Sequence, residues 1–292
     1  MKKIALMLAL LMTVLCVFAS CGKKESGGLV INADASADAG TQIITGLMDE
    51  TYTLPSNITK IVSLSPAASL ILDNLGASSK LVGVDSVSAG LISGSASTID
   101  PSGAAALAPE VIFVDEANKA ALGSTDIPVF AIPTAQSIAD VNQLTRICGK
   151  VAGVSADDAV NKVTNVANVA QLGSSAYSTK MSAYLDLGDG ETVGGGTYIS
   201  EILYAAGLEN ICTVDGFTSM SEADVVAANP EFIFTVGSVD AYLNNAAFAD
   251  VTAIAKKQVF ALEKKDIRWG SNNISNALSL MYENVSSTRG DE

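Results

Sequence analysis

Short hydrophobic runs alternate with segments of helical periodicity, and this alternation occurs twice along the chain. Apolar runs bounded by turn residues predict strands, and the periodic segments that end at glycine predict helices. The predicted strands are 60–64, 81–85, 111–114, 127–132, 181–187, 232–235 and 258–262, and the clearest helices are 67–75 and 198–206. Strands that alternate with helices indicate parallel sheets with helices on both faces.

A Pro-Glu corner before an apolar strand marks the second half of each copy. Pro109-Glu110 precedes one such strand, and Pro230-Glu231 precedes the other 121 positions further on. Gly76 and Gly207, which end the two helices, lie 131 positions apart. The near-constant spacing predicts two similar lobes of the α/β class, each doubly wound, with a ligand cleft between them.

The segment between the two copies has the periodicity of a helix. Ile138, Val141 and Leu144 are spaced for one helix face, and Gly153 indicates a break before Ala156. We therefore expect one long helix that joins the lobes, and a crossover helix inside a single large sheet is the alternative. The predicted organisation is a signal peptide over 1–20, a lipidated Cys21 and flexible tether over 21–42, a first lobe over 43–136, a linking helix over 137–172, and a second lobe with the final helix over 173–292.

The first residues have the pattern of a secretory signal that ends at a lipidation site. Two lysines precede an apolar run from Ile4 to Phe18, which is short for a membrane span. Ala19-Ser20 followed by Cys21 resembles a bacterial lipobox, in which the segment is cleaved and the cysteine carries diacylglycerol. We therefore predict a lipoprotein anchored to the extracytoplasmic face of the cell membrane, and an ordinary signal peptide is the alternative.

Composition excludes several kinds of chemistry. The chain has no histidine, which removes Ser-His-Asp and Cys-His catalytic pairs and every metal site that contains histidine. Lys and Arg number 17 against 31 for Asp and Glu, so a net charge of −14 disfavours nucleic-acid binding. Cys148 and Cys212 remain after lipidation, as two buried thiols or one disulfide. We predict no catalytic activity, no resident metal and no cofactor.

Several motifs in the same order resemble the substrate-binding proteins of ABC importers for cobalamin and ferric siderophores. They are the "P-x-R-I-V-S-L-S-P" start at 57–66, with Lys60 for the arginine, the "LG…LVGV" pattern at 75–84, the "L-x-P-D-L-I" pattern at 107–112 and the second-lobe segment at 198–211, a helix followed by "AGGENV". The resemblance covers about residues 43–285. It implies two α/β lobes joined by a long helix, a metal-chelate ligand, an ABC permease with its ATPase as partners, and a monomer.

The resemblance also suggests where the permease docks. The family carries one glutamate on each lobe that meets permease arginines, and the matching positions here hold Ser102 and Ala223. The neighbouring acids Asp100, Glu222 and Asp224 are therefore the candidate docking residues.

The cleft between the lobes is the expected ligand site. Ligands of open α/β sheets bind beyond the carboxyl ends of the strands, where the loops carry the candidate residues. These are Ser65, Pro66, Asp85 and Glu116 in the first lobe and Gly196, Tyr198, Arg268 and Trp269 in the second. Trp269 beside Arg268 suits a flat ligand with an anionic edge. Alternatively, Trp269 seals the lobe interface and Arg268 pairs with a local acid.

Three functions follow from these patterns. The first is capture of a corrinoid or a ferric siderophore for import. Haem ranks behind both, since without histidine no imidazole ligates its iron. The second is a surface-anchored enzyme on the same fold, which requires two facing carboxylates. The third is an adhesive lipoprotein whose cleft is filled.

Overall fold

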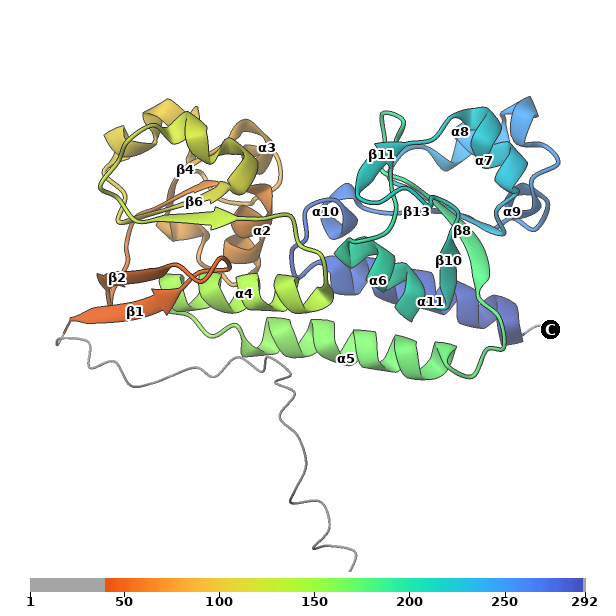
Figure 1. Cartoon of the computed structure of the whole chain (residues 1–292), viewed down its shortest axis with the longest axis horizontal. Coiled ribbons are helices and arrows are strands. Elements are labelled where there is room, and N and C mark those ends of the chain that lie inside the picture. The colour runs from red at the N-terminus through yellow and green to blue at the C-terminus, as the bar shows by residue number, and fades with distance from the viewer. Residues whose placement is uncertain (1–39, 291–292) are drawn as a thin grey trace, which may run out of the picture. The chain divides into compact units, whose positions relative to one another are not determined.

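Two parallel sheets organise residues 40–290, the part of the chain that the computed structural model describes. The strand order is β5-β4-β3-β6-β7 in the first sheet and β10-β8-β12-β13 in the second. Their strands are β3 (Ile61–Leu64), β4 (Leu81–Val84), β5 (Ser97–Thr98), β6 (Val111–Asp115), β7 (Val129–Ile132), β8 (Met181–Asp186), β10 (Leu208–Asn210), β12 (Phe232–Thr235) and β13 (Val259–Ala261). Each sheet and its helices form one lobe (Figure 1), so the predicted two-lobed α/β class is confirmed.

The central strands are uniformly apolar because both of their faces are covered. Every residue of β3 and of β12 is buried, as expected for parallel strands between helix layers. The registers place Leu64 beside Val114 in the first lobe and Thr235 beside Asp186 in the second. The carboxyl ends of neighbouring strands therefore lie at one edge of each lobe, and the loops that follow them gather there.

The glutamates of the two Pro-Glu corners make the same kind of contact in the two lobes: each accepts at least one hydrogen bond from a backbone N–H group of a neighbouring strand segment. Glu110 Oε2 accepts hydrogen bonds from the backbone N–H groups of Thr59 (2.6 Å) and Lys60 (2.9 Å), just before β3. Glu231 Oε2 accepts one from the N–H of Ser182 (2.9 Å) in β8. Each glutamate thus ties a neighbouring strand to the start of the central strand, which gives the sequence repeat a physical cause.

The remaining elements cover the sheets and their edges. The helices are α2 (Pro66–Asn74), α3 (Ser86–Ala89), α6 (Tyr198–Ala205), α7 (Glu222–Ala228), α8 (Val239–Leu243), α9 (Thr252–Ala255), α10 (Lys264–Ile267) and α11 (Ile274–Gly290), with 3₁₀ turns η1 (Ser78–Lys80), η2 (Pro101–Leu107), η3 (Glu116–Leu122) and η4 (Ala246–Phe248). Two antiparallel pairs complete the fold, β1 (Thr41–Thr45) with β2 (Thr51–Pro55), and β9 (Glu191–Val193) with β11 (Phe217–Ser219).

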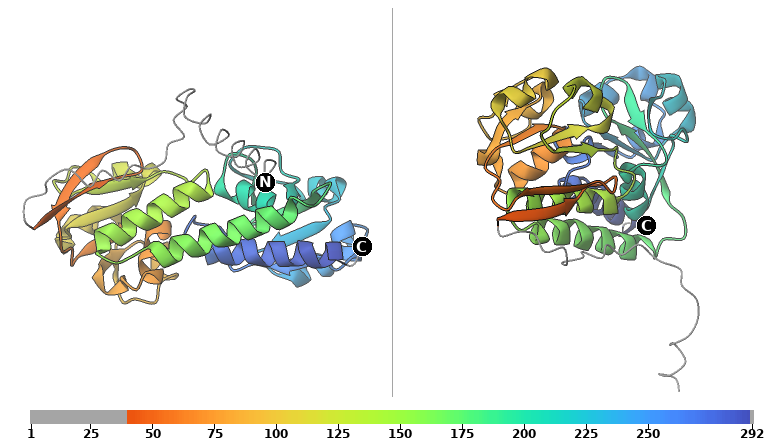
Figure 2. Two further views of the ribbon diagram at one scale, coloured as in Figure 1. Left: turned by 90° about the horizontal axis from the view of Figure 1, so that it is seen from below. Right: turned by 60° about the vertical axis from the view of Figure 1, so that its left-hand side comes forward.

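Two helices, rather than one long helix, join the lobes. They are α4 (Ile138–Ala152) and α5 (Asp157–Ser174), and α4 ends at Gly153, whose φ of 68° favours glycine. Figure 2 shows them alongside α11 on one face of the described chain. Ile138 and Val141 of α4 belong to the core of the second lobe, whereas Leu144 and the later apolar residues of α4 belong to the core of the first. The helix α4 therefore packs into the cores of both lobes.

Both cysteines in the described chain are buried free thiols. Cys148 packs in the core of the first lobe, and burial raises its pKa. The disulfide alternative is therefore wrong, and the prediction of two buried thiols is confirmed. None of the helices in residues 40–290 has the length and hydrophobicity required to cross a membrane. The predicted signal peptide and Cys21 lie outside the described residues.

Candidate ligand-binding cleft

A cleft of about 790 Å³ opens between the two lobes, at the ends of their strands. Its volume lies within the roughly 300–1,000 Å³ that is usual for small-molecule sites. The first lobe and α4 contribute Leu47, Pro66, Ala67, Asp115–Asn118, Ile132–Gln136, Asp140, Gln143 and Leu144, and the second lobe contributes Tyr198, Phe217, Arg268, Trp269 and Gly270. The hypothesis of an adhesive lipoprotein requires a filled cleft, whereas the cleft in the structure is open.

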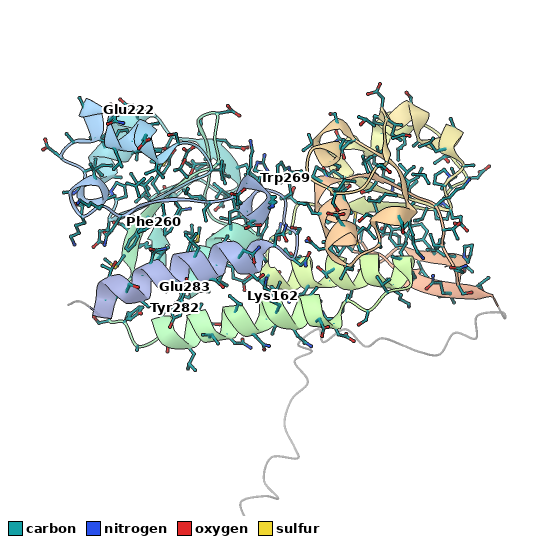
Figure 3. All side chains as sticks on the ribbon, turned by 180° about the vertical axis from the view of Figure 1, so that it is seen from behind. Lys162, Glu222, Phe260, Trp269, Tyr282 and Glu283 are labelled. Carbon is teal, nitrogen blue, oxygen red and sulfur yellow. The ribbon has the colours of Figure 1, made fainter. Side chains whose placement is uncertain are left out.

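Five of the predicted ligand-binding residues line this cleft. They are Pro66, Glu116, Tyr198, Arg268 and Trp269, which come from four separate parts of the chain. Trp269 lies where the two lobes approach each other (Figure 3) and is partly exposed in the cleft wall. The topology therefore brings together residues that the sequence places up to 203 positions apart.

Three other predicted residues do not line the cleft. Ser65 is wholly buried at the start of α2. Asp85 uses its carboxylate to cap α3, accepting the N–H groups of Val87 and Ser88 at 2.9 Å each. Gly196 is exposed in the turn before α6, with a φ of 68°. The helix cap and the positive φ therefore explain why aspartate stands at position 85 and glycine at position 196, without a role in ligand binding.

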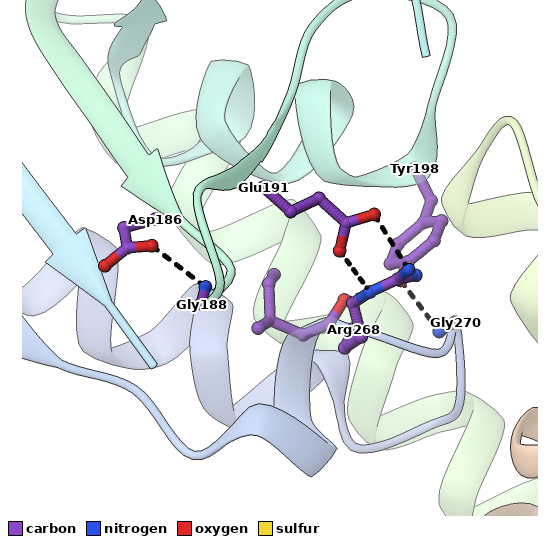
Figure 4. Close-up of polar contacts among 7 residues, drawn as sticks. Asp186, Gly188, Glu191, Tyr198, Arg268 and Gly270 are labelled. Carbon is purple, nitrogen blue, oxygen red and sulfur yellow. Dashed lines mark hydrogen bonds and ion pairs between the residues drawn. The ribbon is translucent and has the colours of Figure 1, made fainter. Parts of the chain in front are cut away.

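Tyr198 positions one wall of the cleft. Its hydroxyl donates to the carbonyl of Ile267 (2.5 Å) and accepts the N–H of Gly270 (2.8 Å; Figure 4). The side chain is 2% exposed, and burial raises its pKa, so the phenol keeps its proton. Both roles of the hydroxyl are therefore used in holding the turn that presents Trp269.

Arg268 forms an ion pair with Glu191. An ion pair with an acid of the chain itself was the alternative to ligand binding for this residue. Its Nε lies 2.9 Å from Oε2 of Glu191 and its Nη2 donates to Oε1 at 3.0 Å, a bidentate pair (Figure 4). The guanidinium carbon lies 4.4 Å from the ring centroid of Phe217, in cation–π geometry. The guanidinium is thus held in position by one residue from each of the two paired strands, Glu191 of β9 and Phe217 of β11.

Asp115 is a partly buried carboxyl group in the cleft wall. Burial raises its pKa, the charge of Asp85 adds to that rise, and the Ser65 hydroxyl and Arg268 oppose it. Asp85 therefore influences the cleft through its charge although it does not line it.

Phe217 was not among the residues predicted for the site. It lies in a strand of three residues, of which only this one is aromatic. Such a short segment has no periodicity from which to predict a strand. The apolar and polar residues of the first turns of α4 were also missed, since their helical spacing indicates only burial.

The predicted docking acids are exposed on both lobes. Asp100 precedes η2 without capping it. Glu222 lies on the side of the second lobe opposite the linking helices (Figure 3), and its Oε2 accepts a hydrogen bond from the Asn245 side chain (2.7 Å). Asp224 accepts one from the Ser221 hydroxyl (2.6 Å). Their role in docking remains a prediction.

The sequence was compared with known protein families and with individual proteins. No protein-family model matches the chain. The cobalamin-binding protein of Halobacterium salinarum is 28% identical over an alignment of 208 residues that covers 64% of this chain and 56% of that protein. The chain thus spans little more than half the length of the curated relatives it matches.

Solved structures share the fold over most of the chain. The molybdate-binding protein MolA of Haemophilus influenzae matches with a TM-score of 0.71 at 21% identity, covering 86% of this chain and 91% of that one. The vitamin B12 binding protein BtuF of Vibrio cholerae matches with a TM-score of 0.65 at 18% identity, covering 80% and 99%. The chain therefore has the two-lobed, helical-backbone fold of periplasmic solute-binding proteins, and the resemblance found in the sequence is confirmed at the level of the fold.

Proposed function

We propose that this chain is the extracytoplasmic substrate-binding lipoprotein of an ABC importer and that it captures a metal chelate, either a corrinoid or a ferric siderophore. The ligand binds between the lobes, and the loaded protein presents Asp100, Glu222 and Asp224 to the permease. Cys21 carries the lipid anchor. No bond is made or broken in this function.

The cleft between the lobes is the observation that carries the proposal. Its walls combine the aromatic side chains of Trp269 and Phe217 with amide and hydroxyl groups such as Gln143 and Thr134. Aromatic faces suit the flat surface of a macrocycle or a planar chelating group, and the polar groups fix its orientation. The cobalamin-binding relative and the binding proteins of the same fold support this class of ligand.

The alternative of a surface-anchored enzyme lacks its catalytic pair in this cleft. A hydrolase of the kind considered needs two carboxylates that face each other across the substrate. Asp115, Glu116 and Asp140 all come from the first lobe and α4, and no described lining residue of the second lobe is acidic. Asp140 is also occupied, because its Oδ2 accepts the N–H groups of Gln136 and Ser137.

Calorimetric titration with corrinoids and iron complexes of siderophores tests the proposal. We expect at least one chelate to bind with a Kd of about 1 μM or lower. Trp269→Ala should weaken that binding about tenfold or more, because an aromatic contact is lost from the cleft wall. Tyr204→Ala, which removes an exposed aromatic of the same lobe outside the cleft, is the matched control. Failure of every chelate in a broad panel to bind would refute the proposal.

A further inference from the structure

The charged residues that line the cleft are unevenly balanced. Among the described lining residues, Asp115, Glu116 and Asp140 are acidic, and Arg268 alone is basic. The whole chain carries a net charge of −14, so the field beyond the cleft has the same sign. An anionic ligand would meet repulsion on approach and would depend on Arg268 for compensation.

Arg268 offers an incoming anion only reduced compensation, because a carboxylate already opposes its charge. Glu191 holds the guanidinium through two contacts, at 2.9 and 3.0 Å, and the Phe217 ring centroid lies 4.4 Å from the guanidinium carbon. These contacts leave Nη1 outside the ion pair. A guanidinium already paired with a carboxylate can donate a hydrogen bond to an amide or hydroxamate oxygen but offers little net charge to a second anion.

Glu191 lies outside the lining of the cleft and acts on it only through Arg268. It begins β9, and its side chain is 32% exposed. β11, which carries Phe217, pairs with β9 so that Ser219 faces Glu191 and Phe217 faces Val193. This pair of strands therefore supplies both the carboxylate and the ring that hold Arg268.

We infer that Glu191 is a specificity-determining residue that neutralises Arg268, so that the cleft accepts uncharged or cationic chelates rimmed with neutral hydrogen-bond acceptors and rejects anionic chelates. This inference rests on the proposed function and narrows its ligand class. It favours amide-rimmed corrinoids and iron trihydroxamates over catecholate and carboxylate complexes.

Ligand pairs that differ in charge but not in shape test the inference. One pair is cyanocobalamin and the analogue in which one side-chain amide is hydrolysed to a carboxylate. The other is an iron trihydroxamate with a free amine and the same complex succinylated at that amine. We expect the wild-type protein to bind the uncharged or cationic member of a pair about tenfold more tightly than the anionic member, measured by calorimetry at low ionic strength.

Two variants separate the role of Glu191 from a general effect of charge. Glu191→Gln keeps an oxygen that can accept from Arg268 but removes the negative charge. Asp189→Asn removes the same charge from an exposed position two residues earlier, where the φ of 55° is compatible with asparagine. Glu191→Gln should reduce the preference against the anionic member about fivefold or more, and Asp189→Asn should change it less than twofold. Melting curves establish that both variants are folded.

Each outcome bears on the inference. Wild-type protein that binds the anionic member as tightly as the other, or equal effects of the two variants, would overturn the inference while leaving the proposed function intact. Failure of all these chelates to bind would overturn the proposed function and this inference with it. A preference that decreases in Glu191→Gln alone supports the assignment.

Discussion

Gly194 is required by the packing of the backbone next to Gly196, one of the predicted ligand-binding residues. It opens the run Gly194–Gly196, and a Cβ at Gly194 would overlap the carbonyl oxygen of Val214 and lie 3.1 Å from that of Cys212. Its N–H donates to the carbonyl of Gly216 at 2.9 Å. The glycine therefore permits the segment that follows β9 to lie close against the segment that precedes β11.

Gly194→Ala should lower the free energy of unfolding by about 1–3 kcal/mol or more, because the added methyl group has no room. Thermal or urea denaturation measures the change. Gly103→Ala is the control, since the nearest atom to its Cβ would be a side-chain carbon of Ile99 at 3.9 Å. The control should change stability by about 0.5 kcal/mol at most. Equal stability of the two variants would contradict this explanation by close packing.

The raised pKa of Asp115 leads us to expect that the stability of the protein depends on pH. Because its pKa in the folded protein lies above the ordinary value of 3.8, the folded state holds this proton more tightly than the unfolded state does. Stability therefore falls as the pH rises from about 3.8, the pKa of the unfolded state, through the higher pKa of the folded state, and the loss is complete above that pKa. Asp115→Asn should raise the melting temperature at pH 7.5 by about 1–3 °C, and the gain should vanish below about pH 4.

Asp189→Asn serves as the control for this measurement, since it removes an exposed carboxylate that does not line the cleft. A lower melting temperature of Asp115→Asn at pH 7.5 would show instead that Ser65 and Arg268 stabilise the charged carboxylate by more than burial costs.

At the scale of elements, burial decides what the sequence can predict. Strands such as β3 and β12 were predictable because a fully buried parallel strand is an uninterrupted apolar run. The antiparallel pair β9 and β11 was not, because its strands have three residues each and mix polar with apolar positions. These two strands hold Glu191 and Phe217, and so the groups that contact Arg268 were not predicted although Arg268 itself was.

The linking segment illustrates a second limit. Its apolar spacing predicted helix throughout, and Gly153 indicated where the helix breaks, but periodicity alone does not tell how the halves are arranged. Packing of α4 against both cores and of α5 against α11 determines that arrangement. These are contacts between residues far apart in the sequence.

The start of α4 is stabilised by a capping box. The Ser137 hydroxyl accepts the N–H of Asp140 (3.2 Å), and the Asp140 carboxylate accepts the N–H of Ser137 (3.0 Å). Ser137→Ala should therefore reduce the free energy of unfolding by about 1 kcal/mol, measured by urea denaturation. Ser286→Ala in α11 is the control, since its hydroxyl donates only to a carbonyl of its own helix, that of Glu283. An equal loss in both variants would refute a special role for the cap.

At the scale of the two lobes, hydrogen bonds between the lobes limit how far they can move. Glu201 of α6 accepts the N–H of Ile138 at 2.6 Å, which attaches the second lobe to the first turn of α4. Asn74, at the end of α2, donates to the side-chain oxygens of Asn272 and Asn273 at 2.9 Å each. A helix shared by two cores and these hydrogen bonds favour small lobe displacements over wide opening.

The hydrogen bonds of Asn74 to Asn272 and Asn273 can be removed without changing a residue that lines the cleft. Asn74 is exposed and does not line the cleft, so Asn74→Ala should lower the free energy of unfolding by less than about 1 kcal/mol. It removes two hydrogen bonds that hold the first lobe against the start of α11, and the lobes should then fluctuate more. We expect ligand dissociation to become about three- to tenfold faster, measured by stopped-flow displacement, and amide exchange to increase at residues 270–273. Asn168→Ala, an exposed asparagine on α5, should change neither. Unchanged dissociation in Asn74→Ala would show that the shared helix alone sets the lobe geometry, because the bonds lost in this variant join the lobes independently of α4.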